Sequence, residues 1–369
     1  MLSNTYLKIN LDNYRFNINY LKKHSNKNLI AIIKANAYGA VDYKCAEILN
    51  EEGIDFFGVS SLLEALSLRR HGIRGEILIL GYVDPQNLDT VIKNSLSIAT
   101  VSKDYVNELL NYDISGLKIH LKIDTGMNRI GLFKVEVKDA LNKLLDKGAK
   151  VEGIFTHYAT SDEDLKFTAV QYQRFKDVLH GLNYNFKYIH TSNTDATVAF
   201  NDEVSNYVRC GLGLLGYSSY KSELKPCVSL HSKVINCKLA KKDTAISYGQ
   251  HYHLLEDEYI ATVAIGYADG LLRSNTGRHV YIDGEYAEIV GSICMDQMMV
   301  HINKPAAIKS DVEIFGEHIS LYDMANDNKT IPYEILTSIS DRVTRVYVDS
   351  DDKVLDMISN RYSKEENHD

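Results

Sequence analysis

The chain of 369 residues carries a net charge of −8, with 45% hydrophobic and 24% charged residues. This length and apolar content suffice for one large domain and one smaller one. The acidic balance excludes nucleic acid and anionic membranes as expected partners, because both require a concentrated basic face.

Cysteines and hydropathy narrow the class of protein further. The five cysteines are scattered and form no C-x-x-C pair, so we expect neither a disulfide framework nor a metal site. No apolar run of about 18 residues is present to span a bilayer, and the first residues alternate like a strand rather than a leader. We expect a cytoplasmic protein without a membrane segment in this sequence, and an excised cytoplasmic domain of a membrane-anchored protein would look the same.

Short apolar runs alternate with longer amphipathic ones through the first two thirds of the chain. The apolar runs include LIAII, EILILG, LKIHLKI, VEGIFTH and YIHTSN, and helical patterns such as SLLEALSLRRHG and EVKDALNKLLDKGAK lie between them. Six or more such β–α units predict a closed parallel barrel or a doubly wound sheet. From about residue 233, strand-length alternations between Gly, Asp and Asn turns predict a mainly β domain, so we expect domains at 1–232 and 233–369.

A lysine, Lys34, stands where the first apolar run of the β–α region leaves the core, in AIIKANAYGA. Burial lowers the pKa of a lysine and frees its amine, which Schiff-base chemistry with a carbonyl compound requires. The alternative is a lysine that snorkels to solvent at a strand end.

Polar residues also follow later strands of the predicted sheet, where parallel strands bring them to one edge. These residues are Arg129, His157, Thr194 and Arg209. Each has a structural alternative: a surface arginine, a satisfied core histidine or a helix N-cap. Gly211 and Gly213 allow backbone amides to approach an anion, or serve tight loop packing instead. A lysine, an anion cradle and flanking arginines together meet the needs of a pyridoxal phosphate site.

Eight stretches, in order along the chain, resemble the signature motifs of the alanine racemase family. They are IIKANAYGA, LKIDTGMNRIG, FTHYATSDED, HTSNTDA, VRCGLGLLGY, ISYG, AIGYADGLLR and VGSICMDQMMV. The resemblance implies a fold-type III enzyme: a TIM-like β/α barrel that carries pyridoxal 5′-phosphate, followed by a mainly β C-terminal domain. It also implies a head-to-tail homodimer whose active sites combine both subunits.

The resemblance assigns cofactor contacts residue by residue. Lys34 would bind the cofactor covalently, and Arg209 would face its ring nitrogen and keep that nitrogen unprotonated, because arginine does not give up its proton. The other cofactor contacts would be Tyr38, His157, Thr194, Gly211 and Leu212.

The resemblance also assigns the groups that handle a small amino-acid substrate. Racemisation removes the Cα proton from one face and returns a proton to the other, so one base on each side is required. Lys34 would serve the D-enantiomer and Tyr267, from the partner subunit, the L-enantiomer. Arg129 and the backbone of the partner's Met295 would hold the substrate carboxylate. Lys122 matches a lysine that is carbamylated in some members, where it positions the arginine.

Four positions depart from the family pattern: Thr194 for serine, Leu215 for tyrosine, Ser292 for arginine, and Asp341 for a tyrosine that narrows the substrate pocket. Aspartate is shorter than tyrosine and adds acceptors, so we expect a pocket that prefers serine, with activity on alanine as well. This resembles the serine racemase domains of glycopeptide (vancomycin)-resistance membrane proteins, which supply D-serine to cell-wall precursors. The alternative is a housekeeping alanine racemase in which Asp341 pairs with Arg342 or Arg345.

Other function classes remain open at this point. Small pyridoxal phosphate-binding regulatory proteins share the barrel but lack a β-domain, and a non-catalytic binding module would not need two bases. Fold-type III amino-acid decarboxylases share both domains and carry a cysteine-centred motif in place of GYADG, and Cys294 keeps that alternative open.

Overall fold

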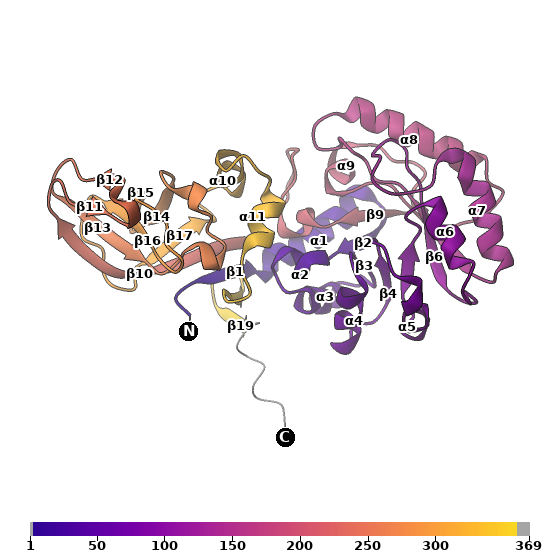
Figure 1. The fold of residues 1–369 in the computed structure, drawn as a ribbon, viewed down its shortest axis with the longest axis horizontal. Coiled ribbons are helices and arrows are strands. Elements are labelled where there is room, and N and C mark those ends of the chain that lie inside the picture. The colour runs from indigo at the N-terminus through magenta and orange to yellow at the C-terminus, as the bar shows by residue number, and fades with distance from the viewer. Residues whose placement is uncertain (1–2, 360–369) are drawn as a thin grey trace, which may run out of the picture. The chain divides into compact units, whose positions relative to one another are not determined.

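The structure, a computed structural model, describes residues 3–359, and these form two compact units (Figure 1). One unit runs from Tyr14 to Lys225, and the other combines residues 3–13 with residues 226–359. The boundary expected after residue 232 therefore differs in two ways: the second unit begins at Pro226, and it includes the N-terminal strand. From its composition we expect the tail SNRYSKEENHD (residues 359–369) to be frayed, and all of it after Ser359 lies outside the described residues.

The larger unit is built on a closed barrel of eight parallel strands, which decides between the two predicted architectures. The ring closes where β2 pairs with β9, with Asn28 opposite Tyr207. Strands buried on both faces read as continuous apolar runs, and β3 is buried at every residue. The strands are β2 (Asn28–Ile32), β3 (Phe56–Val59), β4 (Glu76–Ile79), β5 (Ser97–Ala99), β6 (Lys118–Lys122), β7 (Lys150–Phe155), β8 (Tyr188–His190) and β9 (Tyr207–Cys210).

Helices follow the strands and lie outside the barrel (Figure 1). Helix α4 begins at a capping box, in which the Ser61 hydroxyl accepts from the Glu64 amide and the Glu64 carboxylate accepts from the Ser61 amide. The helical segments are α1 (Leu11–Ser25), α2 (Lys34–Tyr38), α3 (Asp42–Glu51), α4 (Leu62–Arg70), η1 (Pro85–Asn87), α5 (Leu88–Lys93), α6 (Lys103–Leu109), α7 (Lys134–Asp146), α8 (Leu165–His180), α9 (Thr194–Ala199) and η2 (Leu212–Leu215).

The smaller unit is mainly β. The long strand β10 pairs with β17 through its first half and with β13 through its second half, so six strands form a ring of hydrogen-bonded neighbours. The strands are β1 (Tyr6–Asn10), β10 (Val228–Ala240), β11 (Ala245–Ile246), β12 (Tyr252–His253), β13 (Glu258–Val263), β14 (His279–Ile282), β15 (Glu285–Val290), β16 (Met298–Ile302), β17 (Asp311–Phe315), β18 (Thr344–Val348) and β19 (Val354–Ile358).

Helical segments interrupt this β-unit, and its two α-helices were not predicted from the strand-like alternation. The segments are η3 (Tyr248–Gln250), η4 (Tyr267–Asp269), η5 (Arg273–Asn275), α10 (Leu321–Asp327) and α11 (Pro332–Ser338). Each α-helix has only seven residues, which is too short for a clear helical period in the sequence.

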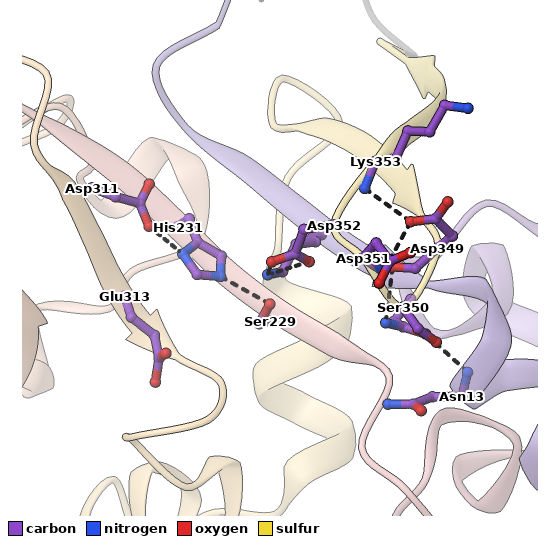
Figure 2. A network of polar contacts seen from close by, with 12 residues as sticks. Asn13, Ser229, His231, Asp311, Glu313, Asp349, Ser350, Asp351, Asp352 and Lys353 are labelled. Carbon is purple, nitrogen blue, oxygen red and sulfur yellow. Dashed lines mark hydrogen bonds and ion pairs between the residues drawn. The ribbon is translucent and has the colours of Figure 1, made fainter.

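A polar network ties β10 to β17 within the β-unit (Figure 2). The His231 ring lies between the Asp311 carboxylate, 2.7 Å from Nδ1, and the Ser229 hydroxyl, 2.9 Å from Nε2. The carboxylate also accepts from Lys233 and Tyr6. Although burial raises the pKa of Asp311, hydrogen bonds from these groups outweigh it and hold the pKa well below its usual range.

Among residues 3–359, no helix is long and apolar enough to cross a membrane. The same residues contain no group of three or more His, Cys, Asp or Glu side chains placed to hold a metal ion, and all five cysteines are free.

Candidate active site

Lys34 lies two residues after the end of β2, at the carboxyl end of the barrel where the sequence predicted it. Its side chain is partly buried, and burial is the main cause that lowers its pKa. The nearby charge of Arg129 lowers the pKa further, whereas the carboxylate of Glu64 opposes the shift. The amine is therefore more readily available in its neutral, nucleophilic form than that of an exposed lysine.

The four residues after Lys34 form a left-handed turn, a conformation that the sequence did not predict. Ala35, Asn36, Ala37 and Tyr38 have φ angles of 51°, 56°, 51° and 55°. Non-glycine residues pay roughly 1–2 kcal/mol each in this region. Glu64 supports the turn, because its carboxylate accepts from the Ala35 amide at 2.8 Å. Strain of this kind is typical of functional sites.

An anion cradle forms where Thr194 meets the loop after β9. The Thr194 hydroxyl oxygen lies 3.1 Å from the Gly213 amide and 3.4 Å from the Gly211 amide. A Cβ on Gly211 would lie 2.2 Å from the Tyr38 hydroxyl oxygen, so only glycine permits this approach. Leu212, between the two glycines, begins η2. A hydroxyl, a phenol and backbone amides therefore meet at one place, and these donors suit a phosphate group.

Arg209 is buried near the end of β9, and both terminal nitrogens of its guanidinium are hydrogen-bonded. Its guanidinium donates to the carbonyl oxygens of Thr156, Thr191 and His190 at 2.7–2.8 Å. It also lies 3.1 Å from His157 Nδ1. Burial lowers the pKa of Arg209 to about 10, so the group stays charged at neutral pH.

Lys122 ends β6 and is buried, with its ammonium donating to the Ile123 carbonyl at 2.8 Å. Burial, and then the charge of Arg209, lower the pKa of Lys122 to about 7. A large share of this amine is thus uncharged near neutral pH.

His157 follows β7 and lies beside Arg209, at the same end of the barrel as Lys34 and Lys122. Burial is the main cause that holds the pKa of His157 well below its ordinary value. The charges of Arg209, Lys122, Arg129 and Lys34 act in the same direction. Cations after β2, at the last residue of β6 and near the end of β9 therefore act on His157, as expected for carboxyl ends of parallel strands.

The β-unit brings its three predicted site residues onto neighbouring loops. Tyr267 and Met295 are about half exposed, and the Tyr267 amide donates to the Cys294 carbonyl at 3.1 Å. Arg342 joins these loops, because it binds Asp269 at 2.6 Å and Asp296 at 2.7 Å.

Asp341, beside Arg342 in the chain, is exposed. The carboxylates of Asp269 and Asp296 already hold Arg342. Arg345 is buried and donates to the carbonyls of Ser340, Val343 and Ile339. The Asp341 charge acts to raise the pKa of Arg345, against a larger lowering by burial.

Comparisons with known proteins cover nearly the whole chain. Residues 9–219 match the alanine racemase N-terminal domain, and residues 227–347 match the alanine racemase C-terminal domain. The chain belongs to the alanine racemase family. An alanine racemase of Macrococcus caseolyticus is 36% identical, over 94% of this chain and 96% of the relative. The alanine racemase structure from Bacillus anthracis superposes with a TM-score of 0.91 at 35% identity and covers 97% of this chain and 98% of its own.

A further solved structure shows that related proteins differ in substrate. It is described as a histidine racemase from Leuconostoc mesenteroides and has a TM-score of 0.87 at 27% identity, covering 94% of this chain and 99% of its own. The family membership establishes an isomerase that uses pyridoxal 5′-phosphate, and it favours the racemase over the decarboxylase and binding-protein alternatives. Within the alanine racemase barrel, the phosphate-compatible cradle and the amine of Lys34 fit this cofactor.

Sequence reasoning missed three residues that support the candidate residues within their own units. Glu64 supports the turn after Lys34, and Arg342 joins the Tyr267 and Met295 loops. His190 accepts from Arg209, and its ring contacts that of His120. The capping-box pattern from Ser61 to Glu64 could have pointed to Glu64. The contacts of Arg342 and His190 join distant segments, so the sequence holds no local signal for them.

Proposed function

We propose that the protein interconverts the L- and D-enantiomers of a small amino acid, with alanine as the first candidate substrate. The observation that carries this proposal is the convergence of Lys34, with its lowered pKa, and the phosphate-compatible cradle on the same end of the barrel. The whole-chain similarity to alanine racemases supports the choice of alanine.

Each residue has a defined role in this proposal. The cofactor, when bound, supplies an electron sink for the charge left on Cα. Lys34 takes or returns the Cα proton on one face, and Tyr267 does so on the other. Arg129 and the backbone of Met295 hold the substrate carboxylate. Arg209, which cannot accept a proton, keeps the cofactor's ring nitrogen unprotonated and so restrains side reactions.

Lys122 is proposed to carry a carbamate. Its pKa of about 7 leaves the neutral amine that attacks CO₂, with release of one proton. The product is an anion, so the repulsion between Lys122 and the cations Arg209 and Arg129 would become attraction. A ¹³C signal from a carbamate in protein equilibrated with ¹³C-bicarbonate, absent in Lys122→Ala, would support this; equal spectra would contradict it.

A head-to-tail homodimer is proposed to complete the site. Exposed apolar side chains follow several barrel strands on the rim where Lys34 lies: Leu63, Tyr82, Phe133 and Val135. A second copy's β-unit, with its exposed Tyr267 and Met295, would cover this rim and supply the second base.

Serine is a second candidate substrate, and Asp341 is the observation that favours it. Of the two arginines nearest in sequence, Arg342 donates to two carboxylates and Arg345 donates to three carbonyls, while the Asp341 charge also acts on Arg345. An exposed carboxylate in place of a tyrosine suits a substrate hydroxyl. The histidine racemase relative supports the idea that this fold admits other side chains. In this setting we propose a cytoplasmic enzyme that supplies D-amino acids for cell-wall precursors.

Chiral chromatography after incubation with each L-amino acid tests the function. We expect cofactor absorbance, exchange of the Cα proton in D₂O, and accumulation of the D-enantiomer of alanine, with serine as the next substrate. A protein that binds the cofactor without exchanging the Cα proton would be a binding protein, and the proposal would fail.

A further inference from the structure

Three buried groups form a hydrogen-bonded chain across the interior of the barrel. His120 on β6 places Nδ1 2.9 Å from Nε2 of His190 on β8. His190 Nδ1 lies 2.9 Å from the guanidinium of Arg209 on β9. His120 and His190 are fully buried, and Arg209 is 4% exposed.

The donors and acceptors of this chain fix where its protons lie. A guanidinium only donates, so Nδ1 of His190 must accept. Burial, with nearby cations, holds the pKa of His190 well below its usual value, and that of His120 falls to about 3, so both rings are neutral. His190 therefore carries its proton on Nε2 and donates it to His120 Nδ1. The proton of His120 must then lie on Nε2.

This arrangement leaves one buried donor unsatisfied. Among the described residues, His120 Nε2 has no hydrogen-bond partner. An unpaired buried N–H is unfavourable, and proteins keep such groups where another requirement dominates. The barrel also makes room for this ring: a Cβ on Gly153 would lie 2.2 Å from His120 Nδ1, and the β6–β7 register shifts between Ile119 and His120.

We propose that His120 is a positioning residue: it accepts the Nε2 proton of His190 and thereby holds His190 in the tautomer that receives Arg209. Without this acceptor, only the guanidinium of Arg209 opposes the other tautomer of His190, whose Nδ1–H would face the guanidinium donors and displace Arg209. The effect on the reaction rests on the proposed function, in which Arg209 faces the cofactor's ring nitrogen.

Imidazole ¹⁵N NMR of wild-type protein labelled on histidine tests the proton positions directly. We expect His190 and His120 to be neutral Nε2–H tautomers, with no titration between pH 5 and pH 8. The signals of His120 and His190 are assigned by comparison with the variants described below. A charged His190, or an Nδ1–H signal from it, would overturn the proposal without any assay of activity.

Two substitutions separate the acceptor role from packing. Asn at position 120 keeps a carbonyl acceptor near the place that His120 Nδ1 occupies in the wild-type protein, and Leu removes the acceptor. We expect His120→Leu to lower kcat about tenfold, equivalent to ~1.4 kcal/mol, with little change in KM, and to shift the His190 ¹⁵N signals. His120→Asn should restore most of kcat. Tyr188→Phe is the control, because Tyr188 stacks on His120 but is not a link of the chain.

Equal kcat for folded His120→Leu and wild type, or equal losses in the Leu and Asn variants, would overturn the positioning role. If His120→Leu does not fold, the proposal is tested by the histidine tautomers measured in the wild-type protein and by kcat of His120→Asn. Failure of the wild-type protein to exchange a Cα proton would instead refute the proposed function, and the tautomer measurement would still decide the proton positions.

Discussion

Lys34 and Lys122 are both lysines at strand ends, yet their surroundings give them different chemistry. Lys34 is partly buried, and its pKa is lowered by the charge of Arg129 and raised by that of Glu64. Lys122 is 2% exposed, and its pKa falls to about 7. A residue type alone therefore does not define a role; burial and neighbouring charge do.

Lys34→Ala should abolish cofactor binding and racemisation together, because the covalent attachment and one of the two bases are lost. We expect kcat/KM to fall by at least about 100-fold. Cofactor absorbance and D-enantiomer formation are the measurements, and the exposed Lys103→Ala is the control. A cofactor adduct that borohydride can still reduce in Lys34→Ala would place the cofactor lysine elsewhere.

Lys122 should make stability depend on pH in a defined window. Its pKa is lowered from 10.5 in the unfolded chain to about 7 in the folded one, so between these values the unfolded chain binds the extra proton. The loss of stability caused by burying Lys122 is therefore complete below pH 7 and disappears as the pH rises toward 10.5. Lys122→Met should thus raise the free energy of unfolding by about 1–4 kcal/mol at pH 7. Urea unfolding in bicarbonate-free buffer at pH 7 and pH 9.5 measures this difference. If the increase in the free energy of unfolding of Lys122→Met over wild type is as large at pH 9.5 as at pH 7, this account is wrong.

Asp341→Tyr should separate the two candidate substrates. If Asp341 lines the substrate pocket as proposed, the ring narrows it and removes the acceptors, so kcat/KM for L-serine should fall roughly 10-fold or more, while that for L-alanine changes little. Asp341→Asn, which keeps an acceptor and the size, is the matched control. Equal losses for both substrates, or no turnover of serine by the wild type, would leave alanine as the substrate.

Among the elements, the turn from Ala35 to Tyr38 is the one most plainly shaped by function. Its left-handed residues place Lys34 at the barrel mouth and carry Tyr38 to the cradle beside Gly211. A sequence without glycine at these positions accepts strain where a relaxed turn would be available, which indicates that the geometry itself is required.

Ala35→Gly should relieve part of this strain. Ala35 is exposed, so no packing is lost, and glycine adopts its φ without penalty. We expect the free energy of unfolding to rise by about 0.5–1 kcal/mol, since the relief exceeds the entropy cost of glycine. Ala159→Gly, exposed and without a positive φ, is the control and should be neutral or destabilising. Lower stability in Ala35→Gly would show that the turn is not strained.

For the whole molecule, the two proposed bases lie on different units of the chain: Lys34 in the barrel unit and Tyr267 in the β-unit. The proposed dimer would bring the Tyr267 of one subunit to the Lys34 of the other. This arrangement can be tested with two inactive variants.

Tyr267→Phe should keep the cofactor but lose turnover in both directions, because each direction needs one base and one acid. Mixing Tyr267→Phe with Lys34→Ala should restore about one quarter of wild-type activity: half of the dimers are mixed, and one of their two sites has both bases. Tagged subunits would confirm exchange, and each variant alone is the control. No restoration in exchanged chains would place both bases in one subunit.

The sequence by itself determined the β–α alternation, the later mainly β region and the strand-end positions of Lys34, His157 and Arg209, because burial periodicity and parallel-strand geometry are local properties. The motifs resembling alanine racemase anticipated the family, which is now shown. The preference for serine stays a prediction.

Only the tertiary structure decided the barrel over the doubly wound sheet, since closure depends on pairing β2 with β9, far apart in the chain. It also placed the N-terminal strand in the β-unit, set four residues after Lys34 in a left-handed turn, and joined His120, His190 and Arg209. Long-range pairing, backbone strain and buried proton networks arise from contacts between distant segments, and no local pattern encodes them.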